Sequence, residues 1–317
     1  MRIERLADEN RRTQGPRRRD EYRRASPVHL RAVERIVADT LAARDAEAPP
    51  SAALLGSGAC TELPLERIIR ACELVALADL DAPGMGRARD ELPPALRSRV
   101  ALVPADLTGG VSRALAELLR AQPWDDLAAL GGPRGFAPIE AAADCLARCP
   151  IPTPPSIPDL ERGAFGLVVS SLTLTQLFSL PLLDVLDTLA LHAPAVADLR
   201  ELSPRYAAAA RDFRRRVALA HLDLIASLLA PSGAAVLITD VTGYLLPARS
   251  GPHHDEPEES YEVLPPAVLD LDADVAARFS RVGEPRRWRW IATQPANGMP
   301  GRAYDVVGMV LRPQAGG

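Results

Sequence analysis

Two glycines and an aspartate form the residue pattern best suited to chemistry in this sequence. Gly56 and Gly58 stand where the apolar run 52–55 gives way to a helix-like segment, so the backbone can turn tightly there and approach a ligand closely. Asp79 follows at the end of a second apolar run, where a carboxylate can accept hydrogen bonds from ribose hydroxyls. The pattern predicts a site for a cofactor that carries a nucleoside.

The elements that must position these residues follow from hydrophobic periodicity. Strand-like and helix-like segments alternate along the chain, which predicts a parallel sheet covered by helices. The strand-like segments are 52–55, 74–78, 100–103, 165–170 and 234–239, and the helix-like segments are 27–41, 63–71, 112–121 and 206–229. Two further strand-like segments, 287–293 and 304–311, predict a terminal hairpin.

We expect one domain with an extension. Residues 1–26 form an arginine-rich arm, which is either solvated or binds a substrate or partner, and residues 27–317 form the domain. Segments 122–163 and 242–284 are longer than ordinary connections, so we expect lids or substrate-facing insertions there.

Composition limits the class of protein. The 317 residues are 47% hydrophobic and 25% charged, enough for a substantial core, and the formal net charge of -4 gives no global attraction to nucleic acid. We expect no membrane span and no secretory signal, and therefore a cytoplasmic protein. The four cysteines have no paired framework, so free buried thiols are expected at Cys60, Cys72, Cys145 and Cys149.

The order of these motifs resembles the class I S-adenosylmethionine-dependent methyltransferases. The resemblance covers about residues 50–245 and 285–312. It implies a Rossmann-like three-layer α/β sandwich whose seven-stranded, mostly parallel sheet ends with an antiparallel C-terminal strand. The first motif departs twice from the family pattern, because Leu54 stands at the usual acidic position and Cys60 at the third glycine.

The resemblance implies a set of cofactor-binding positions. In the family, residues at the position of Asp79 bind the ribose hydroxyls, and residues at the position of Asp106 accept a hydrogen bond from the adenine amine; Leu107 then offers an apolar wall for the base. The end of the fourth strand also carries contacts, at Ser170, Ser171 and the nearby Gln176. The full set expected to bind S-adenosyl-L-methionine is Gly56, Ser57, Gly58, Glu62, Asp79, Leu80, Asp106, Leu107, Ser170 and Ser171.

Local structural roles stay open for several of these residues. A glycine turn of this kind occurs in many α/β proteins, and each aspartate could be only a helix N-cap. Glu62 could interact with a helix dipole or contact the methionine ammonium. His221 is most simply a packed or surface-facing helix residue.

Methyl transfer needs alignment and exclusion of water, with a general base when the acceptor is a hydroxyl or amine. The candidate catalytic residues are Asp240, His253 and His254, and Tyr244 lies close behind Asp240. The run 253–256 lacks the spacing of a ligand motif, so a solvated loop is preferred and no metal site is predicted.

The leading hypothesis is a methyltransferase that acts on a small molecule or a protein. Nucleic acid is a disfavoured acceptor, because the segment 170–176 lacks the Asn/Asp-Pro-Pro-aromatic motif of the resembling DNA amino-methyltransferases. The alternatives are a non-catalytic methyltransferase-like binding module and, less favoured, a nicotinamide-dependent oxidoreductase. The sequence leaves the acceptor and the oligomeric state open.

Overall fold

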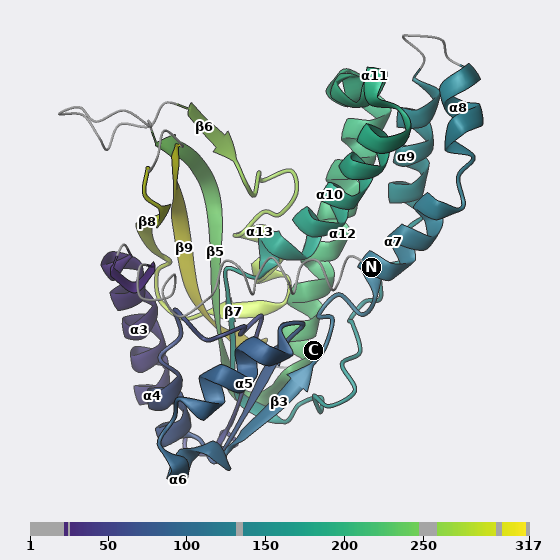
Figure 1. The fold of residues 1–317 in the computed structure, drawn as a ribbon. Coiled ribbons are helices and arrows are strands. Elements are labelled where there is room, and N and C mark those ends of the chain that lie inside the picture. Colours follow the sequence, from purple (N-terminus) through teal and green to yellow (C-terminus); the bar gives the residue numbers. More distant parts are fainter. Residues whose placement is uncertain (1–21, 25, 131–135, 247–258, 296–299, 315–317) are drawn as a thin grey trace, which may run out of the picture.

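A nine-stranded sheet forms the centre of the part of the chain that the structure describes (Figure 1). The structure is a computed structural model and describes residues 22–24, 26–130, 136–246, 259–295 and 300–314. The strands are β1 (Ser51–Leu55), β2 (Leu74–Asp79), β3 (Val100–Pro104), β4 (Phe165–Ser171), β5 (Leu229–Leu246), β6 (Glu259–Glu262), β7 (Phe279–Arg281), β8 (Arg286–Thr293) and β9 (Gly301–Pro313).

The strand order runs β3-β2-β1-β4-β5-β9-β7, with β6 paired to β5 and β8 paired to β9. Strands β3, β2, β1, β4 and β5 are parallel, and β9 enters antiparallel beside β5. The seven strands of the main path and the antiparallel C-terminal strand confirm the fold expected from the sequence. The terminal hairpin is confirmed as well, by the antiparallel pairing of β8 with β9.

Helices cover both faces of the sheet. One face carries α3 (Pro27–Ala42), α4 (Leu65–Ala71), α5 (Ala82–Asp90) and α6 (Pro94–Arg97). The other face carries α7 (Val111–Arg120), α8 (Trp124–Leu130), α9 (Ala137–Arg148), α10 (Leu174–His192), α11 (Pro194–Ala197), η2 (Asp198–Leu202) and α12 (Pro204–Leu228), several of which project beyond the sheet. The short α13 (Ala273–Ala276) packs beside β7.

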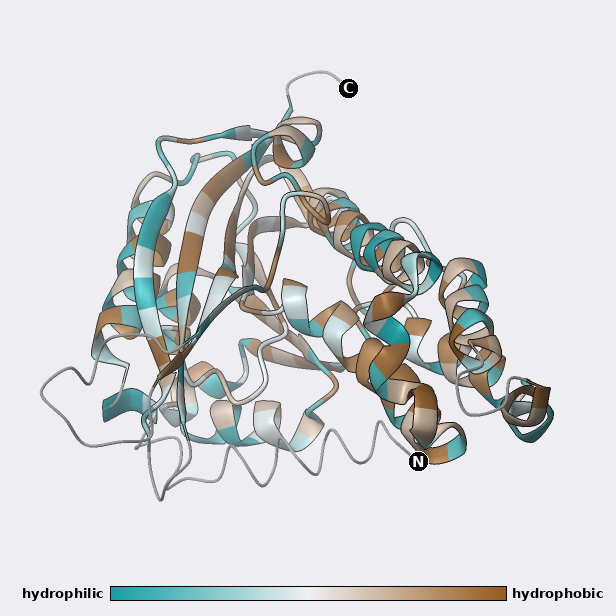
Figure 2. Ribbon diagram, turned by 90° about the horizontal axis from the view of Figure 1, so that it is seen from above, coloured by the Kyte–Doolittle hydropathy of each residue, from teal (hydrophilic) through white to brown (hydrophobic). Residues whose placement is uncertain are grey.

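The central strands are apolar on both sides because each side faces a helical layer. Every residue of β4 is buried, and alternate residues of β5 enter different cores: Ala235 and Leu237 face α12, whereas Val236 and Ile238 face α3 and α4. Figure 2 shows the same distribution, with apolar residues on the central strands and mixed residues on the outer helices. This two-sided burial is the physical basis of the three-layer sandwich.

The two segments expected as insertions contain regular structure. Segment 122–163 holds α8 and α9, and α9 packs against α12. Strand β5 continues to Leu246, past the expected start of the second insertion. The sequence also failed to predict α10, whose apolar residues occupy most sides and hide the helical period. By length and composition alone α10 could cross a membrane, but here it packs against α7, α9 and α12.

Candidate functional site

The glycine loop and Asp79 are fastened to each other at the C-terminal edge of the sheet. Gly56 and Gly58 have left-handed φ values of +68° and +44°. The N–H of Gly58 donates to Asp79 Oδ2 at 2.9 Å, and the N–H of Asp81 donates to Oδ1 at 2.7 Å. Burial raises the pKa of Asp79, and these backbone donors partly offset the effect. Asp79 therefore holds the glycine loop in place. Its predicted contact with the ribose of a cofactor stays a prediction.

Cys60, which stands at the position of the third glycine in the family motif, has a left-handed backbone conformation. Its φ is +50°, a left-handed value that side-chain-bearing residues rarely adopt, and its N–H donates to Ser57 O at 2.7 Å. The turn is thus preserved despite the substitution. Leu54, which stands at the usual acidic position of the family motif, is a fully buried core residue.

Two buried hydroxyls at this edge have no hydrogen-bond partner among the described residues: Ser57 Oγ in the loop and Ser171 Oγ at the end of β4. Buried polar atoms are normally satisfied, so orphaned atoms in a loop of this kind fit a site that takes a polar ligand. Leu80, directly after Asp79, is 40% exposed and offers apolar surface beside them. Together these groups match a nucleoside cofactor. The hydroxyls and the glycine loop suit its polar parts, and the exposed leucine suits its flat base.

Asp106 lies after β3 at the same edge and has a local role. Its Oδ1 accepts hydrogen bonds from the N–H and the hydroxyl of Thr108, at 2.9 and 2.6 Å. Thr108 Oγ1 in turn accepts from the N–H of Val111 at the start of α7. Leu107 is buried in the core beneath α7, with 4% exposure. The proposed adenine contacts of Asp106 and Leu107 stay predictions.

Ser170 and Ser171 point into different surroundings. Ser170 is fully buried and its Oγ hydrogen-bonds to Nε2 of His221 on α12 at 2.8 Å. Burial lowers the pKa of His221 to about 4, so the imidazole is neutral at physiological pH. The packed alternative for His221 is therefore the one observed. Ser171 carries the orphaned hydroxyl, and Gln176 is exposed.

Asp240 lies at the same edge, on β5 where the parallel pairing with β4 has ended. It is only 8% exposed, and its Oδ1 accepts a hydrogen bond from Thr175 Oγ1 at 2.6 Å. Burial is the main cause that raises the pKa of Asp240; the charge of Glu62 raises it further, and the Thr175 hydrogen bond acts the other way. A buried carboxylate with a raised pKa at this edge of the sheet is a reasonable proton acceptor.

Glu62 is the centre of a hydrogen-bond network that the sequence did not predict. Its Oε2 accepts from the Tyr22 hydroxyl at 3.2 Å and faces His29 Nε2 at 3.0 Å. Nδ1 of His29 accepts from Trp288 Nε1 at 3.0 Å, so His29 is neutral with its proton on Nε2. The only sequence signal was the position of His29, four residues before Val33 on the apolar face of α3. The network links the N-terminal segment, the glycine loop and the hairpin.

Threonines at the start of α10 connect the ends of two strands, and the sequence analysis missed them too. Thr173 Oγ1 donates to Leu55 O on β1 at 3.1 Å, and Thr175 Oγ1 donates to Asp240, which lies on β5 just beyond the pairing with β4. Their spacing of two residues directly after the serines of β4 was the available signal. The other two candidate bases, His253 and His254, lie outside the described residues and stay predictions.

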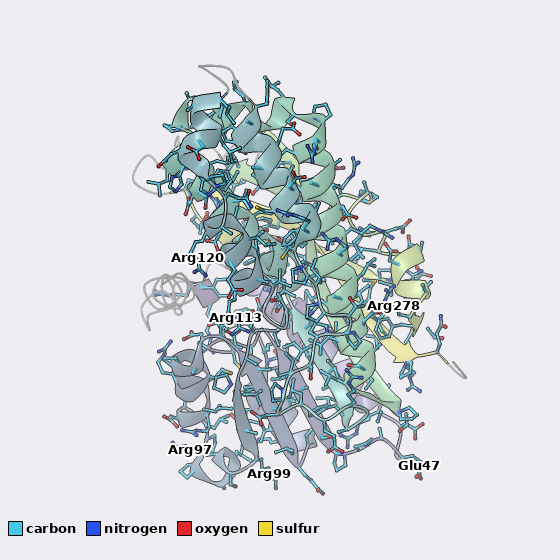
Figure 3. All side chains as sticks on the ribbon, turned by 90° about the vertical axis from the view of Figure 1, so that its right-hand side faces the viewer. Glu47, Arg97, Arg99, Arg113, Arg120 and Arg278 are labelled. Carbon is cyan, nitrogen blue, oxygen red and sulfur yellow. The ribbon has the colours of Figure 1, made fainter. Side chains whose placement is uncertain are left out.

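A separate cavity of about 1050 Å³ lies between α7 and α10. Figure 3 labels Arg113 and Arg120, two residues of α7 that line the cavity. It also labels Arg99, which precedes β3 at the opposite edge of the sheet. Trp124 and His192 stack at 6.2 Å between ring centroids and also line the cavity. Its volume suits an organic molecule of moderate size.

The strand order and the position of the glycine loop define the fold class of this chain. The strand order, the antiparallel β9 and the loop at the carboxyl ends of the parallel strands are those of the class I S-adenosylmethionine-dependent methyltransferase fold. No family model and no curated protein matches the sequence.

Solved structures similar to this chain include three methyltransferases. An S-adenosylmethionine-dependent methyltransferase from Aquifex aeolicus has 9% identity over 98% of this chain and 97% of its own, with a TM-score of 0.37. A precorrin-6y C5,15-methyltransferase from Geobacter metallireducens has 11% identity over 88% of each chain and a TM-score of 0.35. An arsenic(III) methyltransferase from Chlamydomonas reinhardtii has 14% identity over 91% of this chain and 74% of its own, with a TM-score of 0.32. Because these TM-scores are below 0.5, the fold assignment rests on the strand order.

Proposed function

We propose that this protein is an S-adenosylmethionine-dependent methyltransferase that acts on a small molecule or a protein. The observation that carries the proposal is the set of groups at one sheet edge: the left-handed glycine loop, Asp79 and the orphaned hydroxyls of Ser57 and Ser171. When bound, S-adenosylmethionine supplies a methyl group on a positively charged sulfur.

The chain would bind and orient this cofactor with its loop residues. The two backbone donors on Asp79 use two of the roughly four acceptor sites of a carboxylate, so ribose hydroxyls can still donate to it. Leu80 and the glycine loop would exclude water from the base and the ribose. Asp240 would accept the proton that an acceptor loses.

Titration calorimetry with S-adenosylhomocysteine and with NAD tests the proposal. We expect S-adenosylhomocysteine to bind, and Asp79→Ala to weaken it at least tenfold, because the variant removes both a ribose acceptor and the brace of the loop. Asp90→Ala is the matched control, since Asp90 is exposed at the end of α5 and pairs only with its neighbour Arg89. Binding of NAD without S-adenosylhomocysteine would instead support the oxidoreductase alternative and refute ours.

Catalysis is tested separately from binding. With radiolabelled S-adenosylmethionine and a size-fractionated extract as the source of acceptor, label is expected in a small-molecule or protein fraction. Binding of S-adenosylhomocysteine without any label transfer would favour the non-catalytic binding module.

A further inference from the structure

Two acidic side chains lie at the edge of the sheet that carries the glycine loop, the buried Asp240 and the partly buried Glu62. Asp240 accepts a hydrogen bond from Thr175 just beyond the pairing of β5 with β4, and Thr173, two residues before Thr175, donates to the end of β1. The start of α10 thus brings Asp240 towards the glycine loop. The second acid is Glu62, directly after that loop, whose charge acts on Asp240.

The charge of this pair has no arginine partner. In the described part of the chain no arginine forms an ion pair with Asp240 or Glu62, although arginines pair with acids at many other places. Among the described residues, the basic side chain hydrogen-bonded to Glu62 is His29, and it is neutral because its Nδ1 accepts the Trp288 hydrogen bond. A buried carboxylate without a charged partner costs free energy, so a cationic ligand would stabilise Asp240.

A cluster of aromatic rings lies beside Glu62, which accepts a hydrogen bond from the Tyr22 hydroxyl. Two of the three tryptophans and three of the five tyrosines lie in this region: Trp288, Trp290, Tyr22, Tyr261 and Tyr304. The rings of Trp290 and Tyr304 are 5.2 Å apart between centroids. Tyr304 lies two residues before Val306, the β9 partner of Asp240, so Tyr304 and Asp240 are diagonal neighbours on one face of the sheet. Burial is the main cause that raises the pKa of Tyr304. Aromatic faces next to carboxylates are typical of ammonium-binding sites.

Gly243 makes room for one of these rings. It pairs with Tyr261 on β6 and with Tyr304 on β9, and a Cβ on Gly243 would overlap the Tyr261 ring. The glycine thus allows Tyr261 to lie across β5 beside Tyr304, close to Asp240. The aromatic wall is built into the sheet rather than into a loop.

We propose that the methyl acceptor is an amine, bound as its ammonium form by Asp240 and Glu62 among these rings. The inference rests on the proposed function and names its substrate class. The ammonium gives one proton to the Asp240 carboxylate, and the nitrogen lone pair then forms the new N–C bond. The C–S bond breaks at the same time, and its electron pair stays on sulfur as a neutral thioether. A carboxylate acceptor would be repelled by both acids.

Sinefungin is a direct probe of this charge, because it carries an amine at the position of the transferred methyl group, on a carbon that replaces the sulfur of S-adenosylhomocysteine. We expect the wild-type protein to bind sinefungin at least tenfold more tightly than S-adenosylhomocysteine in calorimetric titrations. Asp240→Asn should remove most of that preference and change S-adenosylhomocysteine binding less than threefold. Glu62→Gln should reduce the preference by a smaller factor.

Asp305→Asn is the matched control. Asp305 lies on β9 near the same end of the sheet but is bonded to Arg289 and to the Tyr244 hydroxyl, so the preference should be unchanged. Asp240→Asn is expected to unfold at a temperature no lower than that of the wild type, since it removes a buried charge and keeps an oxygen for Thr175. A loss of sinefungin binding is then not a folding defect.

The acceptor class is tested with two probes of similar shape. In the presence of saturating S-adenosylhomocysteine, benzylamine should bind more tightly than benzoate. Equal binding of sinefungin and S-adenosylhomocysteine, an Asp240→Asn variant that keeps the preference, or tighter binding of benzoate would each overturn the amine assignment while leaving the cofactor assignment intact. Failure of both cofactor analogues to bind would refute the proposed function itself.

Discussion

Gly56 has a conformation and a neighbour that both exclude a side chain. Its φ of +68° favours glycine, and a Cβ there would overlap Thr173 Oγ1. Thr173 cannot simply move away, because it donates to Leu55 O at the end of β1. The close approach of the loop to the start of α10 therefore depends on this one missing methyl group.

We expect Gly56→Ala to lower the free energy of unfolding by about 2 kcal/mol, from the left-handed backbone and the steric overlap. Binding of S-adenosylhomocysteine should weaken at least tenfold. Gly86→Ala on α5 is the control, since nothing lies within 4 Å of its Cβ position; a gain of about 0.5–1 kcal/mol is expected there. Chemical denaturation and calorimetry measure both effects. Unchanged ligand binding in Gly56→Ala would exclude the loop from the site.

At the scale of elements, the sequence predicted the segments that have a clear hydrophobic period and that pack against a neighbour close in the sequence. The β1-loop-α4 unit, β2 with Asp79 and the final hairpin have local signals: glycines, an acidic strand end and alternating residues. The network around Glu62 has only the position of His29 on the apolar face of α3, because its members come from α3, the glycine loop and β8 and meet only through packing of the sheet. The role of Thr175 was hidden for the same reason, as its partner Asp240 is 65 residues away.

The Glu62 network should stabilise the contact of the N-terminal segment and α3 with the sheet. Glu62→Ala leaves the donors of Tyr22 and the buried His29 without an acceptor, and we expect a loss of about 2–3 kcal/mol in the free energy of unfolding. Glu66→Ala, four residues further on, removes an exposed pair with Arg70 and should cost no more than about 0.5 kcal/mol. Equal losses in the two variants would mean that the network contributes no more than a surface pair.

At the scale of the whole molecule, the helices that project beyond the sheet share one core with it. The same apolar cluster contains Val168 and Leu237 of the sheet and also Trp124, Ile139 and Phe213 of the projecting helices. The sequence allowed a parallel sheet to be predicted, but not this shared core. The chain forms three helices between β3 and β4, namely α7, α8 and α9. These helices pack against α10 and α12, which come later in the chain.

A continuous core predicts that the sheet and the projecting helices unfold together. Trp124→Phe leaves tryptophan fluorescence to the hairpin, and the double variant Trp288→Phe with Trp290→Phe leaves it to Trp124 on α8. Within each variant, the fluorescence midpoint in urea should match the midpoint of far-ultraviolet circular dichroism, which follows all helices and strands. The comparison is made within a variant because Trp288→Phe removes the hydrogen bond to His29 and lowers stability by itself. If the Trp124 signal changed at lower urea than the circular dichroism, the helices would form a separate unit and the cavity between α7 and α10 could open without unfolding the sheet.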